Sequence, residues 1–143
     1  MEKIRPIALC LFQNKGRILA SKGFDRTKNE NFYRLLGGSI DFFETSQSCI
    51  RREIKEELQS EIENLKFLFV FENLFTYEST RGHEIVFLYS GDLAKQELYN
   101  QKSIRIAENT YELEAEWVSV EDIIAGKIIL YPVLDYQSLL RKL

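Results

Sequence analysis

The sequence has few of the residues that build metal clusters, cross-links or nucleophilic triads. Its 143 residues include two cysteines, Cys10 and Cys49, and one histidine, His83. Two distant cysteines are too few for a disulfide framework and lack the spacing of a zinc site, so we interpret both as reduced thiols. The sequence also shows no Ser-His-Asp or Cys-His arrangement, which argues against a covalent intermediate on such a nucleophile.

Long apolar runs and an excess of basic residues are also missing. The longest purely apolar run, 7–12, is far shorter than the roughly 20 residues that a membrane span needs, and the start of the chain lacks the pattern of a secretion signal. Lys and Arg number 19 against 22 Asp and Glu, a net charge of −3, and they are scattered along the chain. We therefore expect a cytoplasmic protein that binds neither membranes nor, stably, nucleic acid.

What is present suffices for one folded unit. A hydrophobic content of 45% supports one core in a chain of this length, so we expect a single domain over residues 1–143. Apolar runs predict strands at 4–12, 17–22, 65–75, 84–92 and 114–118. Short helices are expected at 120–125, before Gly126, and at 133–142, after Pro132.

The connections between these elements are of different kinds. Residues 14–16 (NKG) predict a hairpin turn joining the first two strands, and 76–83 with Gly82 predicts a second antiparallel pair. Residues 23–33 are polar and irregular and are expected to form a loop, whereas 93–112 favours no single element. Because strands and helices mix without regular alternation, the pattern favours an α+β domain with a mixed sheet.

The segment 37–58, GGSIDFFETSQSCIRREIKEEL, predicts a helix with two distinct faces. At 100° per residue, Ile50, Ile54 and Leu58 form one apolar stripe that would dock on the core. Glu53, Glu56 and Glu57 form a carboxylate arc beside that stripe, at the rim of a cleft. Arg51 and Lys55 are expected to face away from the arc.

Carboxylates at positions i, i+3 and i+4 of a helix come close together, and hard oxygen ligands suit Mg²⁺ or Mn²⁺ better than Zn²⁺. A divalent cation would explain why Glu53 and Glu57, a like-charge pair, are tolerated. The alternative is an ordinary acidic helix face in contact with solvent.

The spacing of the whole segment resembles the Nudix box of the MutT-like hydrolases, G, five residues, E, seven residues, then R-E-U-x-E-E-x-G-U, where U is aliphatic. Seven of the nine fixed positions match, and these are Gly38, Glu44, Arg52, Glu53, Ile54, Glu56 and Glu57. The departures are Gln59 at the glycine and Ser60 at the last aliphatic position. Gln59 would either keep a left-handed conformation, at a cost of about 1 kcal/mol, or let the helix run on. The segments RLLGG (34–38) and EWVSVEDI (116–123) are also similar to Nudix sequences.

The resemblance implies an α/β/α sandwich around a mixed β-sheet and a hydrolase that cleaves the diphosphate linkage of a nucleoside diphosphate joined to another group. It implies that Glu53, Glu56 and Glu57 are catalytic and bind Mg²⁺ or Mn²⁺. Gly37 and Gly38 would let the backbone approach the substrate. Arg52 would hold a glutamate in place, and Glu44 would support the helix start or the metal ligands from behind. Water would attack phosphorus directly.

Several assignments stay open at this point. Glu108, Glu112 and Glu114 are candidates for an additional glutamate at the metal. Phe32, Tyr33, Phe75, Tyr77 and Tyr131 are candidates to stack on a base, and of these Tyr33, next to the box, enters the predicted substrate site, although aromatic residues in strands more often belong to the core. His83 could touch a phosphate or lie on the surface.

The expected partners are a small-molecule nucleoside diphosphate derivative and, in a homodimer, a second copy of the chain. The alternatives to an enzyme are a catalytically silent Nudix-fold sensor that binds a nucleotide, and an interaction domain with a solvated acidic helix.

Overall fold

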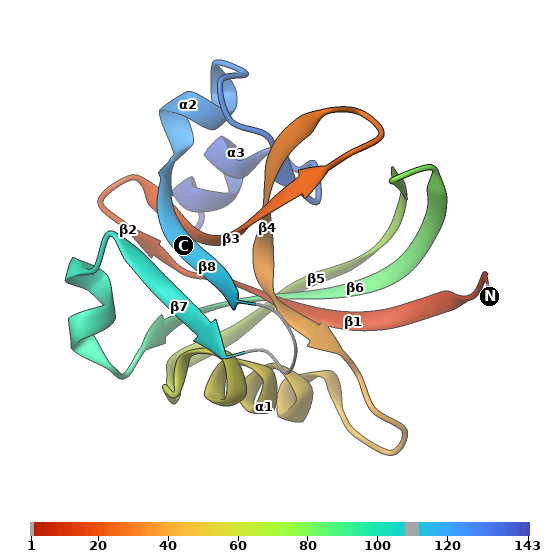
Figure 1. The fold of residues 1–143 in the computed structure, drawn as a ribbon. Coiled ribbons are helices and arrows are strands. Elements are labelled where there is room, and N and C mark those ends of the chain that lie inside the picture. Colours follow the sequence, from red (N-terminus) through yellow and green to blue (C-terminus); the bar gives the residue numbers. More distant parts are fainter. Residues whose placement is uncertain (1, 108–111) are drawn as a thin grey trace.

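The computed structural model describes residues 2–107 and 112–143, and within them nine strands join one mixed sheet (Figure 1). The order of the strands is β5-β6-β1-β4-β3-β8-β7, with β2 beside β3 and β9 beside β4. Neighbours are antiparallel except for β1 with β6 and β4 with β9, which are parallel. The strands are β1 (Ile4–Leu11), β2 (Gln13–Asn14), β3 (Arg17–Asp25), β4 (Glu30–Ser39), β5 (Ile62–Tyr77), β6 (Thr80–Leu93), β7 (Ser103–Ala107), β8 (Glu112–Ser119) and β9 (Leu130–Tyr131).

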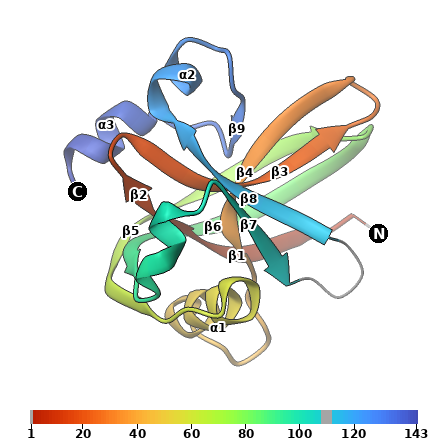
Figure 2. The ribbon, with the colours of Figure 1, turned by 60° about the vertical axis from the view of Figure 1, so that its left-hand side comes forward.

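Helices cover both faces of the sheet (Figures 1 and 2). One face carries α1 (Ser46–Leu58), and the other carries α2 (Val120–Ile124) and α3 (Tyr136–Arg141). A short 3₁₀ helix, η1 (Gln96–Asn100), precedes β7. The predicted α+β class and the α/β/α arrangement around a mixed sheet are therefore confirmed.

The alternation of strand β1 explains why the sheet has two cores. Ala8 and Cys10 point toward α1 and belong to the cluster that contains its buried stripe, whereas Ile7 and Leu9 belong to the cluster beneath α2 and α3. The predicted helix stripe is confirmed, because Ile50, Ile54 and Leu58 are all buried.

The hairpin turn near residue 15 forms as predicted, but it joins other strands than expected. Lys15 and Gly16 both have positive φ, as a two-residue hairpin turn of type I′ requires. The turn connects β3 to the two-residue strand β2, and β1 instead pairs with β4 and β6. Turn chemistry is local and can be recognised in the sequence, whereas the pairing of β1 depends on residues far along the chain.

The prediction of a loop at 23–33 is wrong. Strand β3 continues to Asp25 and β4 begins at Glu30, so only 26–29 form a turn, with Asn29 at a φ of 52°. The polar residues that suggested a loop lie on two long, paired strands that rise above the rest of the sheet (Figure 1). Likewise Gly82 lies within β6, because the second hairpin turns at Glu78 and Ser79.

Hydrogen bonds and an ion pair join the tips of these two hairpins. Arg26 donates through Nε and Nη2 to the two carboxylate oxygens of Glu78, at 3.0 and 3.1 Å. The backbone N–H of Glu78 donates to Asp25 Oδ2 at 3.1 Å, and Lys28 Nζ donates to the carbonyl of Thr76 at 2.9 Å. We call this set of contacts the tip clasp. It stabilises the extended strands that the sequence suggested were a loop.

The C-terminal third departs from prediction mainly in detail. The strand at 114–118 and the helix at 120–125 are confirmed, while the last helix is shorter than 133–142 and begins after Asp135, whose carboxylate caps it by accepting from the Ser138 N–H. Part of the unassigned segment 93–112 forms η1 and β7. In the part of the chain that the structure describes, no helix is long and apolar enough to cross a membrane.

Candidate active site

Helix α1 starts and ends at defined caps. Thr45 Oγ1 accepts from the Ser48 N–H at 3.1 Å, which satisfies one of the free donors of the first turn. At the other end Gln59 takes the left-handed conformation, with φ 52°, and donates its N–H to the carbonyl of Lys55. The helix therefore ends where a glycine would end it, at a conformational cost of about 1 kcal/mol relative to glycine.

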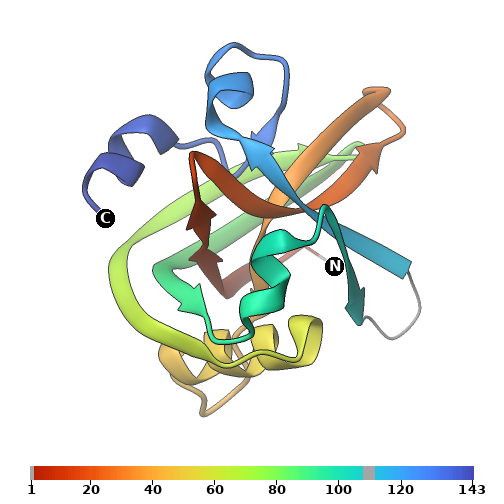
Figure 3. The same ribbon diagram turned by 90° about the vertical axis from the view of Figure 1, so that its left-hand side faces the viewer.

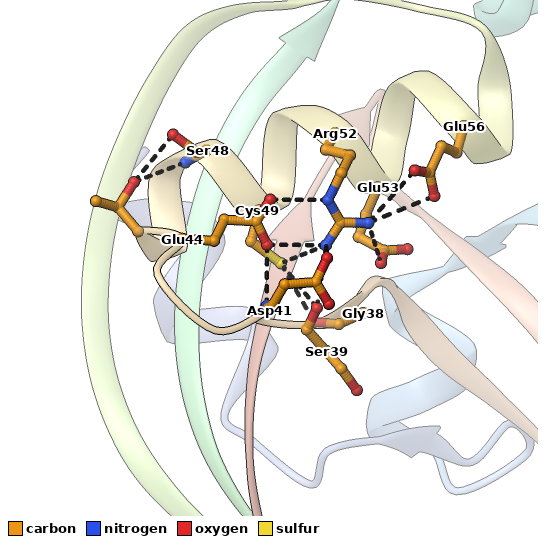
Figure 4. Close-up of polar contacts among 10 residues, drawn as sticks. Gly38, Ser39, Asp41, Glu44, Ser48, Cys49, Arg52, Glu53 and Glu56 are labelled. Atoms are coloured by element: carbon orange, nitrogen blue, oxygen red, sulfur yellow. Dashed lines mark hydrogen bonds and ion pairs between the residues drawn. The ribbon is translucent and has the colours of Figure 1, made fainter.

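The Arg52 side chain lies at the centre of a cluster of carboxylates (Figure 4). Its Nε and Nη2 donate to the two oxygens of Glu44 at 2.8 and 2.9 Å, and its Nη1 donates to Glu53 at 2.9 Å. Glu56 lies at 3.4 Å from Nη1 and Asp41 at 3.4 Å from Nη2. The bidentate pair with Glu44 gives the guanidinium one fixed orientation between the loop and the helix.

This arrangement shifts the ionisation of both partners. Hydrogen bonds from the Arg52 side chain lower the pKa of Glu44 to about 2. The same contact raises the pKa of Arg52 further above its already high value. Glu44 also accepts from the Asp41 N–H at 3.0 Å, so it fixes the loop before the helix. Charge at Glu44 therefore holds Arg52 and the preceding loop together.

Gly37 and Gly38 have different structural reasons to be glycine. Gly37 has a φ of 147°, and a Cβ there would overlap the backbone carbonyl oxygen of Ala8 in the neighbouring strand. A Cβ on Gly38 would lie 2.6 Å from each carboxylate oxygen of Glu53. Gly37 therefore permits the pairing of β4 with β1, and Gly38 makes room for the Glu53 carboxylate.

The three helix glutamates differ in exposure. Glu57 is only 7% exposed, and the side chains of Glu53 and Glu56 are 17% and 57% exposed. Arg51 and Lys55 face away as expected, since they contact the Ile62 carbonyl and Glu61. Arg52, which the sequence analysis expected to hold a glutamate in place, reaches the carboxylate arc and donates to Glu53.

The carboxylates suit a hard divalent cation in chemistry, but they are not assembled around one point. Among residues 2–107 and 112–143, no three His, Cys, Asp or Glu side chains stand close enough together to hold a metal ion. The ligand types do fit, since Glu53, Glu56 and Glu57 offer only carboxylate oxygens from one region of a helix.

A cavity of about 530 Å³ opens between the two long hairpins. Phe32, Phe75, Tyr77 and Tyr131 line it, so these aromatic side chains do not belong to the core as sequence statistics favoured. The Phe32 ring packs edge-on against Tyr77 and Tyr131, with centroids 5.9 and 5.5 Å apart. The cavity thus has an aromatic wall beneath the tip clasp. We call it the hairpin cavity.

The floor of the hairpin cavity is a buried charge network. The Glu84 side chain is only 3% exposed, and its Oε2 lies 3.0 Å from Arg34 and 3.9 Å from Arg5. Asn73 Nδ2 donates to the other oxygen of Glu84 at 3.2 Å. A single carboxylate therefore holds two guanidinium groups at the lining of the cavity.

Ser39 joins the cavity to the carboxylate cluster. Arg5 Nη2 donates to Ser39 Oγ at 2.7 Å, and Arg52 Nη2 donates to the Ser39 carbonyl at 3.2 Å. One residue of β4 therefore links the arginines of the hairpin cavity to the carboxylate cluster.

Several residues that the sequence suggested for the substrate or metal site lie outside the carboxylate cluster and the lining of the hairpin cavity. Tyr33 lies on the opposite face of β4 from Phe32 and Arg34, packs against the second core and donates its hydroxyl to Glu116 at 3.0 Å. His83 lies in β6, 3.9 Å from Glu72. Glu114 is exposed on β8, opposite Arg105 of β7. Glu108 and the side chain of Glu112 lie outside the described residues.

Both cysteines are free, as predicted, and both are buried. Cys49 lies behind the cluster, with Sγ 3.4 Å from the Ser39 carbonyl, and burial raises its pKa to about 12. Neither thiol is ionised near neutral pH, which removes both as nucleophiles.

Comparison with known proteins decides the family. The sequence model of the NUDIX domain matches residues 2–137. The chain belongs to the Nudix family. A NUDIX hydrolase from Nitrosomonas europaea is 16% identical, over 96% of this chain and 86% of that one, with a TM-score of 0.65. A MutT NUDIX hydrolase from Burkholderia pseudomallei is 20% identical, over 96% and 95% of the two chains, with a TM-score of 0.57. These structural likenesses support the fold, and the family match assigns the chain to the pyrophosphohydrolases in general.

Several residues of this Nudix site were missed in the sequence. Asp41 and Ser39 occupy the variable positions of the Nudix box, where the pattern carries no information. Glu84 gave a weak signal, as an acid at the start of an apolar strand, but its partner Arg34 is 50 positions away. Only the pairing of β1 with both β4 and β6 brings these side chains together.

Proposed function

We propose that this Nudix protein is a metal-dependent hydrolase that cleaves the diphosphate linkage of a nucleoside diphosphate joined to another group. The observation that carries the proposal is the position of Glu53, Glu56 and Glu57 on α1, in a network that Ser39 links to the arginines of the hairpin cavity. Nudix proteins generally use divalent metals and act on small molecules. The choice of Mg²⁺ or Mn²⁺, and of a nucleotide, is our inference.

Glu53, Glu56 and Glu57 would hold the cation through carboxylate oxygens. Bound there, Mg²⁺ or Mn²⁺ would neutralise the diphosphate and acidify a water molecule. Glu57 and Glu53, the two less exposed glutamates, are the candidates to orient the attacking water. Arg52 would keep Glu53 turned toward Gly38, and Glu44 would keep Arg52 in place.

The hairpin cavity would take the nucleoside part of the substrate. Its aromatic wall offers ring faces and edges to a base. Arg5 and Arg34 together carry more positive charge than Glu84 neutralises, which favours a phosphate beside the base. The diphosphate would then extend past Ser39 toward Glu53.

A substrate panel with Mg²⁺ or Mn²⁺ tests the proposal. Nucleoside triphosphates, ADP-ribose, sugar nucleotides, dinucleoside polyphosphates and capped RNA would be compared by release of phosphate after coupling to a phosphatase. Reaction in ¹⁸O-labelled water should place the label on a phosphate-bearing product. Label on a sugar carbon would contradict attack at phosphorus. Tight binding of a nucleotide without turnover of any compound would favour the alternative, a catalytically silent sensor.

A further inference from the structure

A second cavity lies apart from the proposed active site. It has a volume of about 500 Å³ and lies between the β2–β3 turn, the end of η1 and strand β8. Figure 3 shows the short helix η1 (teal) beside the β2–β3 turn (red). The cavity shares no lining residue with the hairpin cavity. We call it the η1 cavity.

The charged residues that line the η1 cavity are all basic. Lys15, Arg17 and Lys102 contribute three positive charges, and no Asp or Glu among the described residues lines it. In residues 2–107 and 112–143, none of these three cations forms an ion pair within 4.0 Å. The whole chain has a net charge of −3. A concentration of unpaired positive charge on an acidic protein is an attractive site for an anion.

One wall of the η1 cavity is aromatic and firmly held. The rings of Tyr99 and Trp117 stack with centroids 5.3 Å apart and an angle of 24° between their planes. Trp117 Nε1 donates to the Leu98 carbonyl at 3.0 Å, and the Tyr99 hydroxyl accepts from the Leu93 N–H at 2.8 Å. Because the polar end of each ring is already bonded within the protein, what the rings offer to the cavity is apolar surface.

We infer that the η1 cavity binds a nucleoside monophosphate, at a site separate from the one that carries out hydrolysis. The base would pack against Trp117 and Tyr99, and the phosphate would lie among Lys15, Arg17 and Lys102. Side-chain amides of Asn14, Asn100 and Gln101 also line the cavity and offer donors and acceptors to a base or ribose. This inference does not depend on the proposed hydrolytic function.

Trp117 makes the test direct, because it is the only tryptophan of the chain. AMP, GMP and UMP would be titrated against the full chain in EDTA, so that no metal-dependent turnover occurs, while Trp117 fluorescence is recorded. Free N-acetyltryptophanamide corrects for absorption by the nucleotide. We expect a saturable change with at least one nucleotide, and a rising Kd as salt is added, since the site is exposed.

Matched variants locate the signal. Arg17→Gln and Lys102→Gln should each raise Kd by about tenfold, the effect of losing one charge-assisted contact. Lys127→Gln, an exposed lysine outside the cavity, should leave Kd unchanged. Arg34→Gln, in the hairpin cavity, should also leave it unchanged. Loss of the signal in Arg34→Gln would show that it arises at the hairpin cavity and would overturn the inference.

Two further results would count against the η1 cavity as a nucleotide site. The first is the absence of any saturable change at millimolar nucleotide. The second is an equal change with inorganic phosphate alone, because the aromatic wall would then contribute nothing. Saturation by nucleotide, with weaker binding of phosphate, supports the inference.

Discussion

The carboxylate cluster around Arg52 and the floor of the hairpin cavity around Glu84 have opposite charge balances. Arg52 lies within 4.0 Å of four carboxylates, those of Asp41, Glu44, Glu53 and Glu56, a formal surplus of three negative charges. Glu84 lies within that distance of two guanidinium groups, a surplus of one positive charge. Ser39 contacts both networks.

This difference explains how one small site could handle a metal and a phosphate together. The surplus of acid attracts a divalent cation, and the surplus of base attracts an anion. A diphosphate with its metal would have each end next to the network of opposite sign. The predictions that follow test this division, from the largest expected effect to the smallest.

The first prediction concerns the acidic network. Glu57→Gln and Glu53→Gln should each lower kcat by a factor on the order of 10² or more, with a smaller change in KM, because these groups act mainly in the transition state. Steady-state kinetics with the best substrate of the panel measure both constants. Glu63→Gln, an exposed acid on β5, is the matched control and should behave like the wild type. Normal turnover in both helix variants would remove these glutamates from the mechanism.

The second prediction separates the two glycines. Gly37→Ala should destabilise the fold by about 3 kcal/mol or more, because its new Cβ meets backbone that cannot move aside. In Gly38→Ala the new Cβ meets the end of the flexible Glu53 side chain, so stability should change by less than about 1 kcal/mol. Turnover should nevertheless fall roughly 10- to 100-fold, since a displaced ligand is costly. Urea unfolding and kinetics of the same two proteins give both results, and an equal loss of stability would contradict the distinction.

The third prediction concerns the basic network. Arg34→Gln should raise KM about tenfold with little change in kcat, because it removes one charge-assisted contact to the substrate and leaves the metal ligands in place. Lys22→Gln, more exposed at the same cavity and 3.8 Å from Glu116, should have a smaller effect. A fall in kcat of the same size as that in Glu53→Gln would mean that the two networks do not have separate tasks.

The fourth prediction concerns the metal. Millimolar Mg²⁺ or Mn²⁺ should stabilise the wild type by about 2.7 kcal/mol if the free metal is a hundredfold above Kd, and Glu53→Gln should gain much less. In EDTA the two proteins should differ by no more than about 1 kcal/mol, since the like-charge repulsion from Glu57 and the partly exposed pair with Arg52 oppose each other. Melting curves with EDTA and with metal measure both differences. An equal gain in the two proteins would exclude Glu53 as a ligand.

The fifth prediction concerns the pH dependence of stability. The pKa of Glu44 is lowered to about 2 in the folded chain, so its contribution is fully present above its ordinary value of 4.5 and is lost as the pH falls toward 2. Glu44→Gln should therefore be less stable than the wild type at pH 7. The difference in the free energy of unfolding between the two proteins should become smaller between about pH 4.5 and 2. Urea unfolding across this range checks it. If the difference in stability did not depend on pH, the lower stability of Glu44→Gln would come from packing and not from the charge of Glu44.

Local features of the sequence predicted the helix that carries the candidate site better than the pairing of the strands around it. The helix stripe Ile50, Ile54 and Leu58 and the position of the carboxylates follow from helix periodicity, which needs no distant partner. The role of Gly38 beside Glu53 and the bridge through Ser39 depend on the register of β4 against β1. Register is set by pairing between residues far apart, so it could not be deduced from the pattern of one strand.

The wrong prediction of a loop at 23–33 has a different origin. Those residues look like a loop because half of each strand faces a cavity and solvent instead of a core, which removes the apolar alternation. Phe32 is apolar and Arg34 is charged, so the two residues do not form an apolar stripe, and both line the hairpin cavity. Strands whose side chains line a cavity instead of a core therefore resembled a loop in this sequence.

The tip clasp affects which ligands can fit in the hairpin cavity. Arg26 and Glu78 link the tips of the two hairpins, and the pairing of β1 with β4 and β6 joins the same hairpins at their other ends. Two hairpins linked in this way should resist moving apart, so we expect the hairpin cavity to select ligands by their width. The Arg26 side chain is 81% exposed, and dissolved salt therefore weakens its attraction for Glu78. We therefore expect the ionic strength of the solution to change the width of the hairpin cavity, and with it the size of the ligand that the cavity accepts.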